Sequence, residues 1–215
     1  MNPPIALTTV AAALALAALA PAAGAAAPAS PALFKRAVTG NPALKSYTAT
    51  ASLAARMTHP LPLRKTLNGK AWYLKPQLKV EFDNVPPQLA RFKDLSASAA
   101  SFEGSSAQYA LASGSDDGTA STFSLNPKKP GSRVKSVNVI VDDASAKVTK
   151  IVWNYTDGST LSVVPTYSTL GGTRVASSFA INASFPGYGV SGTLTLSDIN
   201  VNATVDPSVF ATAKP

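Results

Sequence analysis

The clearest pattern in the chain is an alternation of apolar and polar side chains between residues 46 and 57. The apolar positions of this segment are Tyr47, Ala49, Ala51, Leu53, Ala55 and Met57. Ser, Thr and Arg side chains occupy most of the positions between them. Successive side chains of a strand point to opposite faces of a sheet, so this alternation predicts an antiparallel strand with one buried face.

Other segments, rich in β-branched and aromatic residues, predict further strands. The second and third strands are expected at residues 66–74 and 78–82, with Lys75-Pro76-Gln77 as the turn between them. The remaining strands are predicted at residues 107–112, 119–125, 133–141, 147–155, 159–164, 166–170, 173–185 and 188–201. Asp157-Gly158 and Gly171-Gly172 are typical of tight hairpin turns. We therefore expect an antiparallel meander that forms one domain.

Two short helices are predicted outside these strands. Ser30 suits a helix N-cap and Pro31 the first helical position, so residues 32–38 are expected to be helical. After Pro86-Pro87, the apolar residues Leu89, Phe92 and Leu95 recur every three positions and predict a short amphipathic helix. Residues 96–106 are rich in Ser and Ala without a clear pattern, and we interpret them as a mobile connector.

The first 26 residues differ from the rest of the chain. Residues 5–20 are uncharged and mostly apolar, and Pro21 and a run of small residues follow them. This order is typical of a secretory signal peptide, although no basic residue precedes the apolar run. The run is shorter than the ~20 residues of a membrane-spanning helix, so cleavage is favoured over a retained anchor. We expect residues 1–26 to be a signal peptide and residues 27–215 to form one exported domain, periplasmic or secreted.

The chain contains no cysteine and a single histidine, His59. The lack of cysteine excludes disulfides, thiolate metal ligands and a cysteine nucleophile. His59 lies beside Pro60 in a predicted loop, with no carboxylates grouped around it to complete a zinc site. Asp116-Asp117 and Asp142-Asp143 stand beside predicted turns, which favours local turn hydrogen bonds over calcium binding. We therefore expect no catalytic residue, no metal and no cofactor, and a protein that is not an enzyme.

The net charge of +8 is concentrated in the first half of the chain. Residues 32–95 carry eleven basic and three acidic side chains, whereas residues 96–215 carry eight of each. This asymmetry suggests an anionic membrane surface or an acidic protein partner, and it fits a role in solubility equally well. The residues expected to form a basic docking surface are Arg64, Lys65, Lys70 and Lys93. Nucleic acid is not expected as a partner, because no basic and aromatic recognition motif is present.

Large apolar side chains are spread over several predicted strands and one predicted helix. If the sheet curls, its apolar face becomes a groove that a short helix can cover. The residues expected to line this groove or its cover are Leu53, Trp72, Phe82, Leu89, Phe92, Phe123 and Trp153. The alternative for each of them is that it simply fills a core.

Several motifs resemble, in their order along the chain, those of LolA-type outer-membrane lipoprotein carriers. Residues 67–82 resemble a strand–turn–strand stretch of that family, in which an aromatic strand runs into a basic-Pro turn. Leu125-Asn126-Pro127-Lys128-Lys129 resembles the Pro-Lys step of the family before a strand of alternating valines. The turns Asp157-Gly158 and Gly171-Gly172 and the ending at residues 201–210 also follow the family pattern.

This resemblance implies a mainly β fold: a strongly curved, unclosed antiparallel β-barrel of about ten strands, with short α-helices covering its mouth. It also implies an apolar cavity that shields acyl chains. In such carriers a basic residue just before the turn proline helps to hold the helical lid. The matching residue is Lys75, and a lysine cannot make the bidentate contacts of the arginine expected there.

Two functions remain open from the sequence. The first is a soluble, monomeric envelope carrier that binds lipoprotein acyl chains or other lipids in the apolar groove. The second is an envelope sensor or interaction module of the same fold that binds a protein partner. The helix predicted to end at residue 95 separates them, since it should move in a carrier and stay packed in an interaction module.

Overall fold

One antiparallel sheet of eleven strands makes up most of the molecule. The structure is a computed structural model and describes residues 27–59, 62–87, 89, 90, 92, 93, 100 and 102–211. The strands are β1 (Ala27–Pro28), β2 (Ser46–His59), β3 (Leu63–Leu74), β4 (Gln77–Phe82), β5 (Tyr109–Asp116), β6 (Ala120–Pro127), β7 (Val134–Asp142), β8 (Lys147–Tyr155), β9 (Thr160–Leu170), β10 (Thr173–Phe185) and β11 (Tyr188–Val201). Their order across the sheet is β1-β5-β6-β7-β8-β9-β10-β11-β2-β3-β4.

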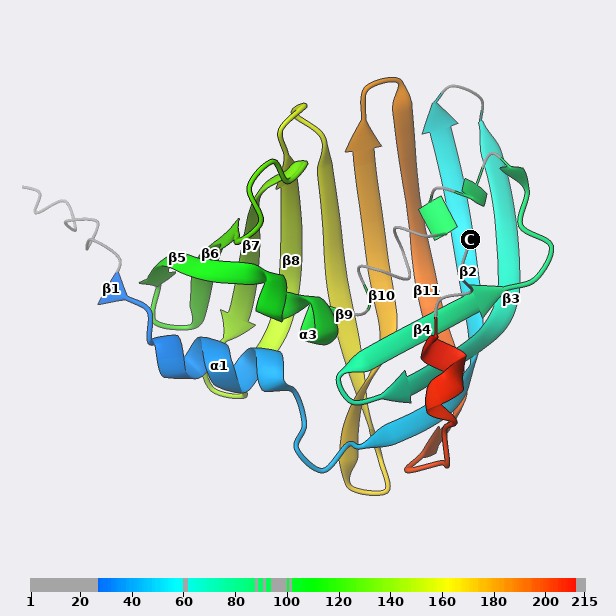
Figure 1. The fold of residues 1–215 in the computed structure, drawn as a ribbon, viewed down its shortest axis with the longest axis horizontal. Helices are drawn as coiled ribbons and strands as arrows, with labels where there is room; N and C mark the ends of the chain where they lie inside the picture. Colours follow the sequence, from blue (N-terminus) through cyan, green and yellow to red (C-terminus); the bar gives the residue numbers. More distant parts are fainter. Residues whose placement is uncertain are drawn as a thin grey trace, which may run out of the picture.

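The order of the strands explains why the sheet is curved but open. Strands β5 to β11 follow one another as a meander, and β11 then pairs with β2, at Leu194 and Leu53 for example. The hairpins β2–β3 and β3–β4 extend the sheet beyond this point. Strands β1 and β4 form the two edges and do not pair with each other. The sheet bends around its concave side without closing (Figure 1), as the resemblance predicted.

Helix α1 (Pro31–Thr39) covers one part of the concave face. Ser30 is its N-cap and Pro31 its first residue, as expected, and Gly40 ends it with a φ of +64°. Leu33 and Ala37, one turn apart, are buried against the sheet. The ring of Phe34 lies 5.2 Å from that of Phe123 on β6. This contact places α1 across the strands nearest to the β1 edge.

Helix α3 (Phe102–Ser105) corrects the prediction of a mobile connector for the described end of residues 96–106, whereas residues 96–99 and 101 lie outside the described residues. It is followed by the 3-10 turn η1 (Ser106–Gln108). Phe102 is only 5% exposed, and its ring packs edge-on against Trp153 of β8 at 5.7 Å. A single aromatic residue thus anchors this part of the Ser/Ala-rich segment on the sheet. Figure 1 shows α1 and α3 side by side in front of the sheet.

Strand β9 corrects the predicted break at Pro165. It runs without interruption from Thr160 to Leu170, and Pro165 pairs with Phe179 of β10. The ladder to β8 on the other side ends at Ile151 and Val163. A proline has no N–H to donate, so it is tolerated where one side of a strand has no partner. The bounds of β8, β10 and β11 agree with those predicted, whereas β3 begins three residues earlier, at Leu63.

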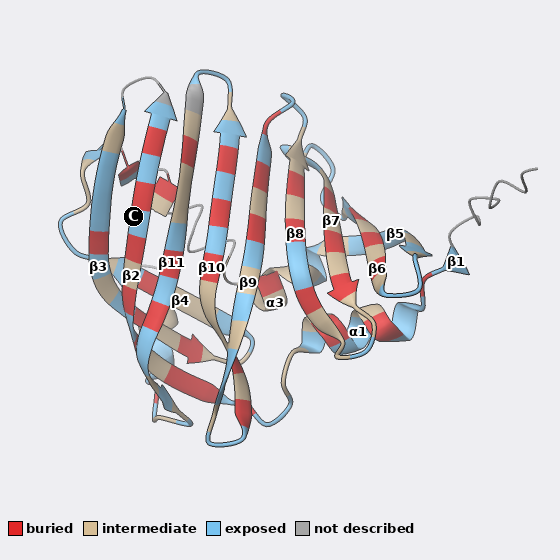
Figure 2. Ribbon diagram, turned by 180° about the vertical axis from the view of Figure 1, so that it is seen from behind, coloured by how far each residue is buried: buried red, intermediate tan, exposed pale blue. Residues whose placement is uncertain are grey.

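The apolar face of β2 lies in the core, as its alternation predicted. All six apolar positions named for this strand are at most 8% exposed. Buried and exposed residues alternate along the neighbouring strands as well (Figure 2). No helix in the described ranges combines the length and the hydropathy needed to span a bilayer. Residues 1–26 and Leu95 lie outside the described residues, so the signal peptide and the end of the predicted helix stay predictions.

Candidate functional site

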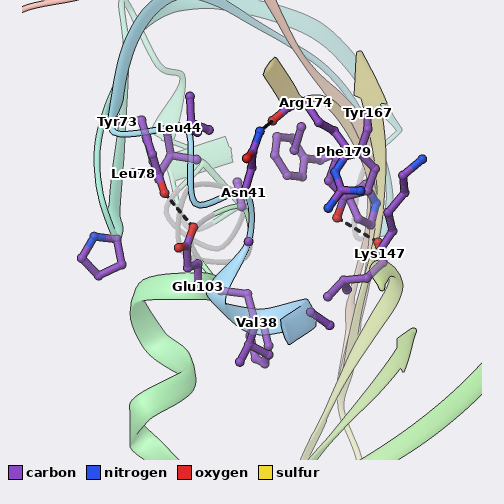
Figure 3. Close-up of a pocket in the computed structure, with 18 of the residues that line it drawn as sticks. Val38, Asn41, Leu44, Tyr73, Leu78, Glu103, Lys147, Tyr167, Arg174 and Phe179 are labelled. Carbon is purple, nitrogen blue, oxygen red and sulfur yellow. Dashed lines mark hydrogen bonds between the residues drawn. The ribbon is translucent and has the colours of Figure 1, made fainter. Parts of the chain in front are cut away.

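A pocket of about 130 Å³ opens between the helical cover and the strands β8, β9 and β10. Its floor is apolar and includes Val148, Ile151, Val163, Pro165 and Phe179. Its cover comes from the end of α1, the loop that follows it and α3. Figure 3 shows Glu103 on one side of this space, Arg174 and Tyr167 on the other, and Asn41 between them.

A β-bulge determines which side chains of β10 reach the pocket. The register between β9 and β10 shifts between Ala176 and Ser178. The pocket is lined by Arg174, Ala176 and Phe179. In a regular strand Ala176 and Phe179, which are three positions apart, would point to opposite faces. A bulge adds one residue and turns the following side chains around. It therefore brings Arg174 to the same space as Phe179.

The helix α3 lies directly on the turn between β3 and β4. A β-carbon added at Gly104 would lie 2.8 Å from the carbonyl oxygen of Pro76. A β-carbon at Gly40 would lie 3.2 Å from the carboxylate of Glu103. Both glycines therefore permit an approach that a side chain would obstruct. The consequence is a close junction of α1, α3 and the β3–β4 turn at the pocket wall.

Three polar side chains join this cover to the sheet, and we call Tyr73, Lys75 and Glu103 the polar junction. The Tyr73 hydroxyl donates a hydrogen bond of 2.7 Å to Glu103 Oε2. Lys75 Nζ lies 3.7 Å from Glu103 Oε1 and donates a 3.2 Å hydrogen bond to the carbonyl oxygen of Asn41. Lys75 thus connects the β3–β4 turn with both covering segments.

Burial changes the acid–base properties of the polar junction. Desolvation raises the pKa of Glu103, and the hydrogen bond from Tyr73 and the nearby Lys75 charge oppose this rise in part. Desolvation and the hydrogen bond to Glu103 both raise the pKa of Tyr73. The ring of Tyr47 stacks on that of Tyr73 at 5.0 Å, and burial raises the pKa of Tyr47 too. Both tyrosines are therefore neutral at physiological pH.

The opposite wall of the pocket carries a cation and a third tyrosine. Arg174 lies with its guanidinium carbon 5.7 Å from the ring centre of Tyr167. The Tyr167 hydroxyl donates a 2.9 Å hydrogen bond to the carbonyl oxygen of Val148 on β8. Desolvation raises the pKa of Tyr167 to about 12, although the Arg174 charge opposes the shift. Asn41 Nδ2 donates to the carbonyl oxygen of Arg174 at 3.3 Å.

The residues predicted to line a groove do not line this pocket. Leu53 and Phe92 are fully buried and Leu89 is 1% exposed. A β-carbon added at Gly192 of β11 would lie 3.0 Å from the ring of Phe92 and 3.3 Å from Leu53. These side chains fill the concave side next to β2 and β11. Phe123 and Trp153 are buried beneath Phe34 and Phe102.

Two other predicted groove residues lie elsewhere. Trp72 is half-buried and alternates with Ala71 and Tyr73, so it occupies the opposite face of β3. Phe82, at the end of β4, is half-buried and packs against the core.

The predicted basic residues of β3 lie on the surface. Arg64, Lys65 and Lys70 are exposed. Arg64 stands opposite Arg56 of β2, whereas Lys70 stands between Thr50 of β2 and Glu81 of β4. Alternation places Lys65 on the other face from Arg64 and Lys70. Lys93 is half-buried. The four residues therefore do not share one face of the sheet.

The sequence analysis missed Tyr73, Glu103, Tyr167 and Arg174. Tyr73 belongs to the same alternation as Leu67 and Ala71, which could have identified it as an inward residue. Glu103 and Arg174 have no comparable signal, because a short helix and a β-bulge place them. Over the ranges that the structure describes, no group of three or more His, Asp or Glu residues could hold a metal ion.

Solved structures with a similar fold have very different sequences. A protein domain from Vibrio parahaemolyticus described as outer-membrane lipoprotein-sorting matches with a TM-score of 0.53 at 12% identity, over 78% of this chain and 90% of that one. A LolA-superfamily protein from Nitrosomonas europaea matches with a TM-score of 0.52 at 11% identity, over 84% of this chain and 96% of that one. A DUF1329 family protein from Desulfovibrio piger matches with a TM-score of 0.50 at 11% identity, over 80% of this chain and 91% of that one.

Comparison at the level of sequence finds no relative. No family model matches the chain, and no curated protein matches it. The structural matches cover most of both chains but lie near 12% identity. The chain therefore has the LolA-like fold of an open, curved antiparallel sheet.

Proposed function

We propose that this protein is an envelope carrier that binds the acyl chains of lipoproteins or other lipids in the pocket below α1 and α3. The observation that carries the proposal is an apolar floor beneath a cover that a few polar contacts attach to the sheet. Burial of an acyl chain is worth ~0.8 kcal/mol per CH₂ group, so such a floor binds a chain without specific polar contacts. We expect no catalytic activity.

The pocket is small for this role while the cover is in place. Its volume of about 130 Å³ is below the ~300–1,000 Å³ of ordinary small-molecule sites. A long chain therefore requires α1 and α3 to move away from the strands. The two helices contain nine and four residues, and neither belongs to the strand order of the sheet.

A pair of tryptophan variants tests the proposal. Ala176 lines the pocket, whereas Ala180 of the same strand is exposed. Ala176→Trp should reduce the affinity for a fluorescent C16 fatty acid at least about tenfold, which corresponds to ~1.4 kcal/mol, because the indole occupies the space of the chain. Ala180→Trp should leave it unchanged. Native mass spectrometry of the wild type should show co-purified lipid. No lipid in that spectrum together with no uptake by the wild type would refute the carrier.

A second candidate is a sensor or interaction module that binds a protein partner through the same fold. The deep burial of Leu89 and Phe92 favours it, because a permanently packed segment suits a fixed binding surface. Hydrogen exchange of residues 87–93 and of α3, with and without fatty acid, separates the candidates. Faster exchange on lipid binding supports the carrier, and unchanged exchange supports the interaction module.

Arg64 and Lys70, which share one face of β3, form the proposed docking surface of the carrier, and Lys65 lies beside them on the other face. Each Lys or Arg near an anionic membrane is worth ~1 kcal/mol. Changing Arg64, Lys65 and Lys70 together to Glu should prevent co-sedimentation with anionic vesicles at low salt. The matched control changes Lys128, Lys129 and Lys135, which are also exposed. Equal losses in the two triple variants would assign the excess charge to solubility alone.

A further inference from the structure

The sheet is split at the pocket between β8 and β9. The ladder between these strands contains four pairs, from Ile151–Val163 to Asn154–Thr160. Strand β8 nevertheless begins at Lys147, and β9 continues to Leu170. Where the ladder is missing, the Tyr167 hydroxyl reaches Val148 and bridges the two strands. Residues from both sides of this split line the pocket.

Two cationic side chains line the pocket at the split. Lys147 comes from the start of β8 and Arg174 from β10, beyond the bulge. Among the residues that the structure describes, the Arg174 guanidinium donates one hydrogen bond, a long one of 3.4 Å to the carbonyl oxygen of Ser145. Within the described ranges, the ion pairs are Lys75–Glu103 and Lys79–Glu81, and neither includes Arg174 or Lys147. Arg174 therefore keeps donors for a ligand.

Two of the acidic groups near the split, Asp142 and Glu103, already have partners. Asp142 stands opposite Lys147 across β7 and β8. Its carboxylate accepts hydrogen bonds from Ser145, which, together with the nearby Lys147 charge, lower the pKa of Asp142. The carboxylate of Glu103 belongs to the polar junction on the other wall, where Tyr73 and Lys75 contact it. The wall formed by Lys147, Tyr167 and Arg174 is thus cationic, whereas the floor between the walls is apolar.

We propose that the pocket takes a single-chain anionic amphiphile, with its carboxylate or phosphate between Arg174 and Lys147 at the β8–β9 split and its acyl chain on the apolar floor. This inference rests on the proposed carrier function and specifies its ligand class. The planar guanidinium matches two oxygens of a carboxylate or phosphate at once. The ring of Tyr167 supports the guanidinium from one side. Its low-dielectric surroundings strengthen the attraction for an anion.

The experiment compares headgroups on one chain length. Palmitate, 1-palmitoyl lysophosphatidic acid and hexadecanol are titrated by calorimetry into the wild type, Arg174→Gln, Arg174→Lys and the control Lys150→Gln. Lys150 is exposed on the same strand as Lys147 and does not line the pocket. Arg174→Gln should weaken binding of the anionic ligands about 10–100-fold, as expected for hydrogen bonds to a charged group, and should leave hexadecanol unchanged. Arg174→Lys should recover part of the loss, and Lys150→Gln should behave as the wild type.

The outcomes separate this inference from the carrier proposal. Equal affinities of the wild type for hexadecanol and palmitate, or equal losses for all ligands in Arg174→Gln, would overturn the anion site while the carrier stands. No binding of any of the three ligands to the wild type would overturn both. Tighter binding of palmitate identifies a fatty-acid carboxylate as the ligand group, and tighter binding of the lysophospholipid identifies a phosphate. A thermal melt of each variant confirms that it folds.

Discussion

Two of the segments that cover the concave side of the sheet are held in place by different interactions. One segment, described at residues 89, 90, 92 and 93, is attached by Leu89 and Phe92, which are buried among apolar neighbours. Helix α3 is attached by one buried ring, Phe102, and by the polar junction at Glu103. Apolar attachment responds little to pH or charge, whereas a buried hydrogen-bonded carboxylate responds to both. The difference indicates that a change in pH or in local charge can detach α3 from the sheet more easily than the segment with Leu89 and Phe92.

Removal of the Phe92 ring tests the apolar side of this comparison and should have the largest effect. Phe92 is fully buried and lies against Leu53 and Gly192. Phe92→Ala should lower the free energy of unfolding by about 3–5 kcal/mol, because it removes apolar contacts and leaves a cavity. Urea denaturation measures this change. The matched control is Leu111→Ala, since Leu111 is 38% exposed and should cost less than about 1 kcal/mol. Similar losses in both variants would contradict the packing described for Phe92.

Removal of the Tyr73 hydroxyl tests the polar side. Tyr73→Phe keeps the ring stacked on Tyr47 but leaves the Glu103 carboxylate without its shortest hydrogen bond. The free energy of unfolding should fall by about 1–3 kcal/mol, and hydrogen exchange should accelerate in α3 but not at residues 89–93. The control is Tyr109→Phe, which alters another partly buried tyrosine near Phe102. Equal acceleration in both covering segments would show that they move as one unit.

The sequence predicted the sheet better than it predicted the pocket. A period of two is a property of the backbone, so the alternation from Tyr47 to Met57 identified the buried face of β2 directly. Trp72 was expected in the groove because of its size, but the same periodicity places Tyr73 inside and Trp72 outside. Periodicity was therefore the better guide wherever it conflicted with residue size.

The pocket depends on features that have no regular pattern. One inserted residue near Ser177 reverses the side chains of β10, and this brings Arg174 to the pocket. Glu103 lies in a segment of mostly small residues without a regular pattern. Phe102 is the one large apolar residue of α3, and it anchors this helix. Lys75 was identified by resemblance alone, and the structure places it beside Glu103 and Asn41. Whether Lys75 holds a movable lid stays a prediction.

A smaller effect is expected from Lys75. Its ion pair with Glu103 is long, at 3.7 Å, and partly exposed, so Lys75→Gln should cost about 1 kcal/mol or less. Because Lys75 also donates to Asn41, hydrogen exchange should accelerate in the loop after α1 as well as in α3. Lys75→Arg retains the charge and should restore the exchange rates. Unchanged hydrogen-exchange rates in Lys75→Gln would show that Lys75 does not help to hold the cover on the sheet.

The pH dependence of Glu103 should be the smallest effect. Burial raises the pKa of Glu103 in the folded protein above its ordinary value of 4.5. The folded state therefore binds the proton more tightly than the unfolded chain does. The resulting stabilisation is complete below the unfolded pKa and is lost as the pH rises through the folded pKa. Urea denaturation of the wild type and Glu103→Gln from about pH 4 to pH 8 should show the wild type losing stability relative to the variant. A constant difference would contradict this assignment.

The short ladder between β8 and β9 also has a mechanical consequence. Its four pairs make it shorter than any other ladder between described strands except the one at the β1 edge. The sheet should twist most easily at this ladder, because fewer hydrogen bonds resist the twist here than in the neighbouring ladders. The two parts of the sheet on either side of this ladder can then rotate relative to each other as rigid bodies, while every strand keeps its structure. Relaxation-dispersion NMR should detect this motion as microsecond-to-millisecond exchange that is greatest at residues 147–150 and 164–167.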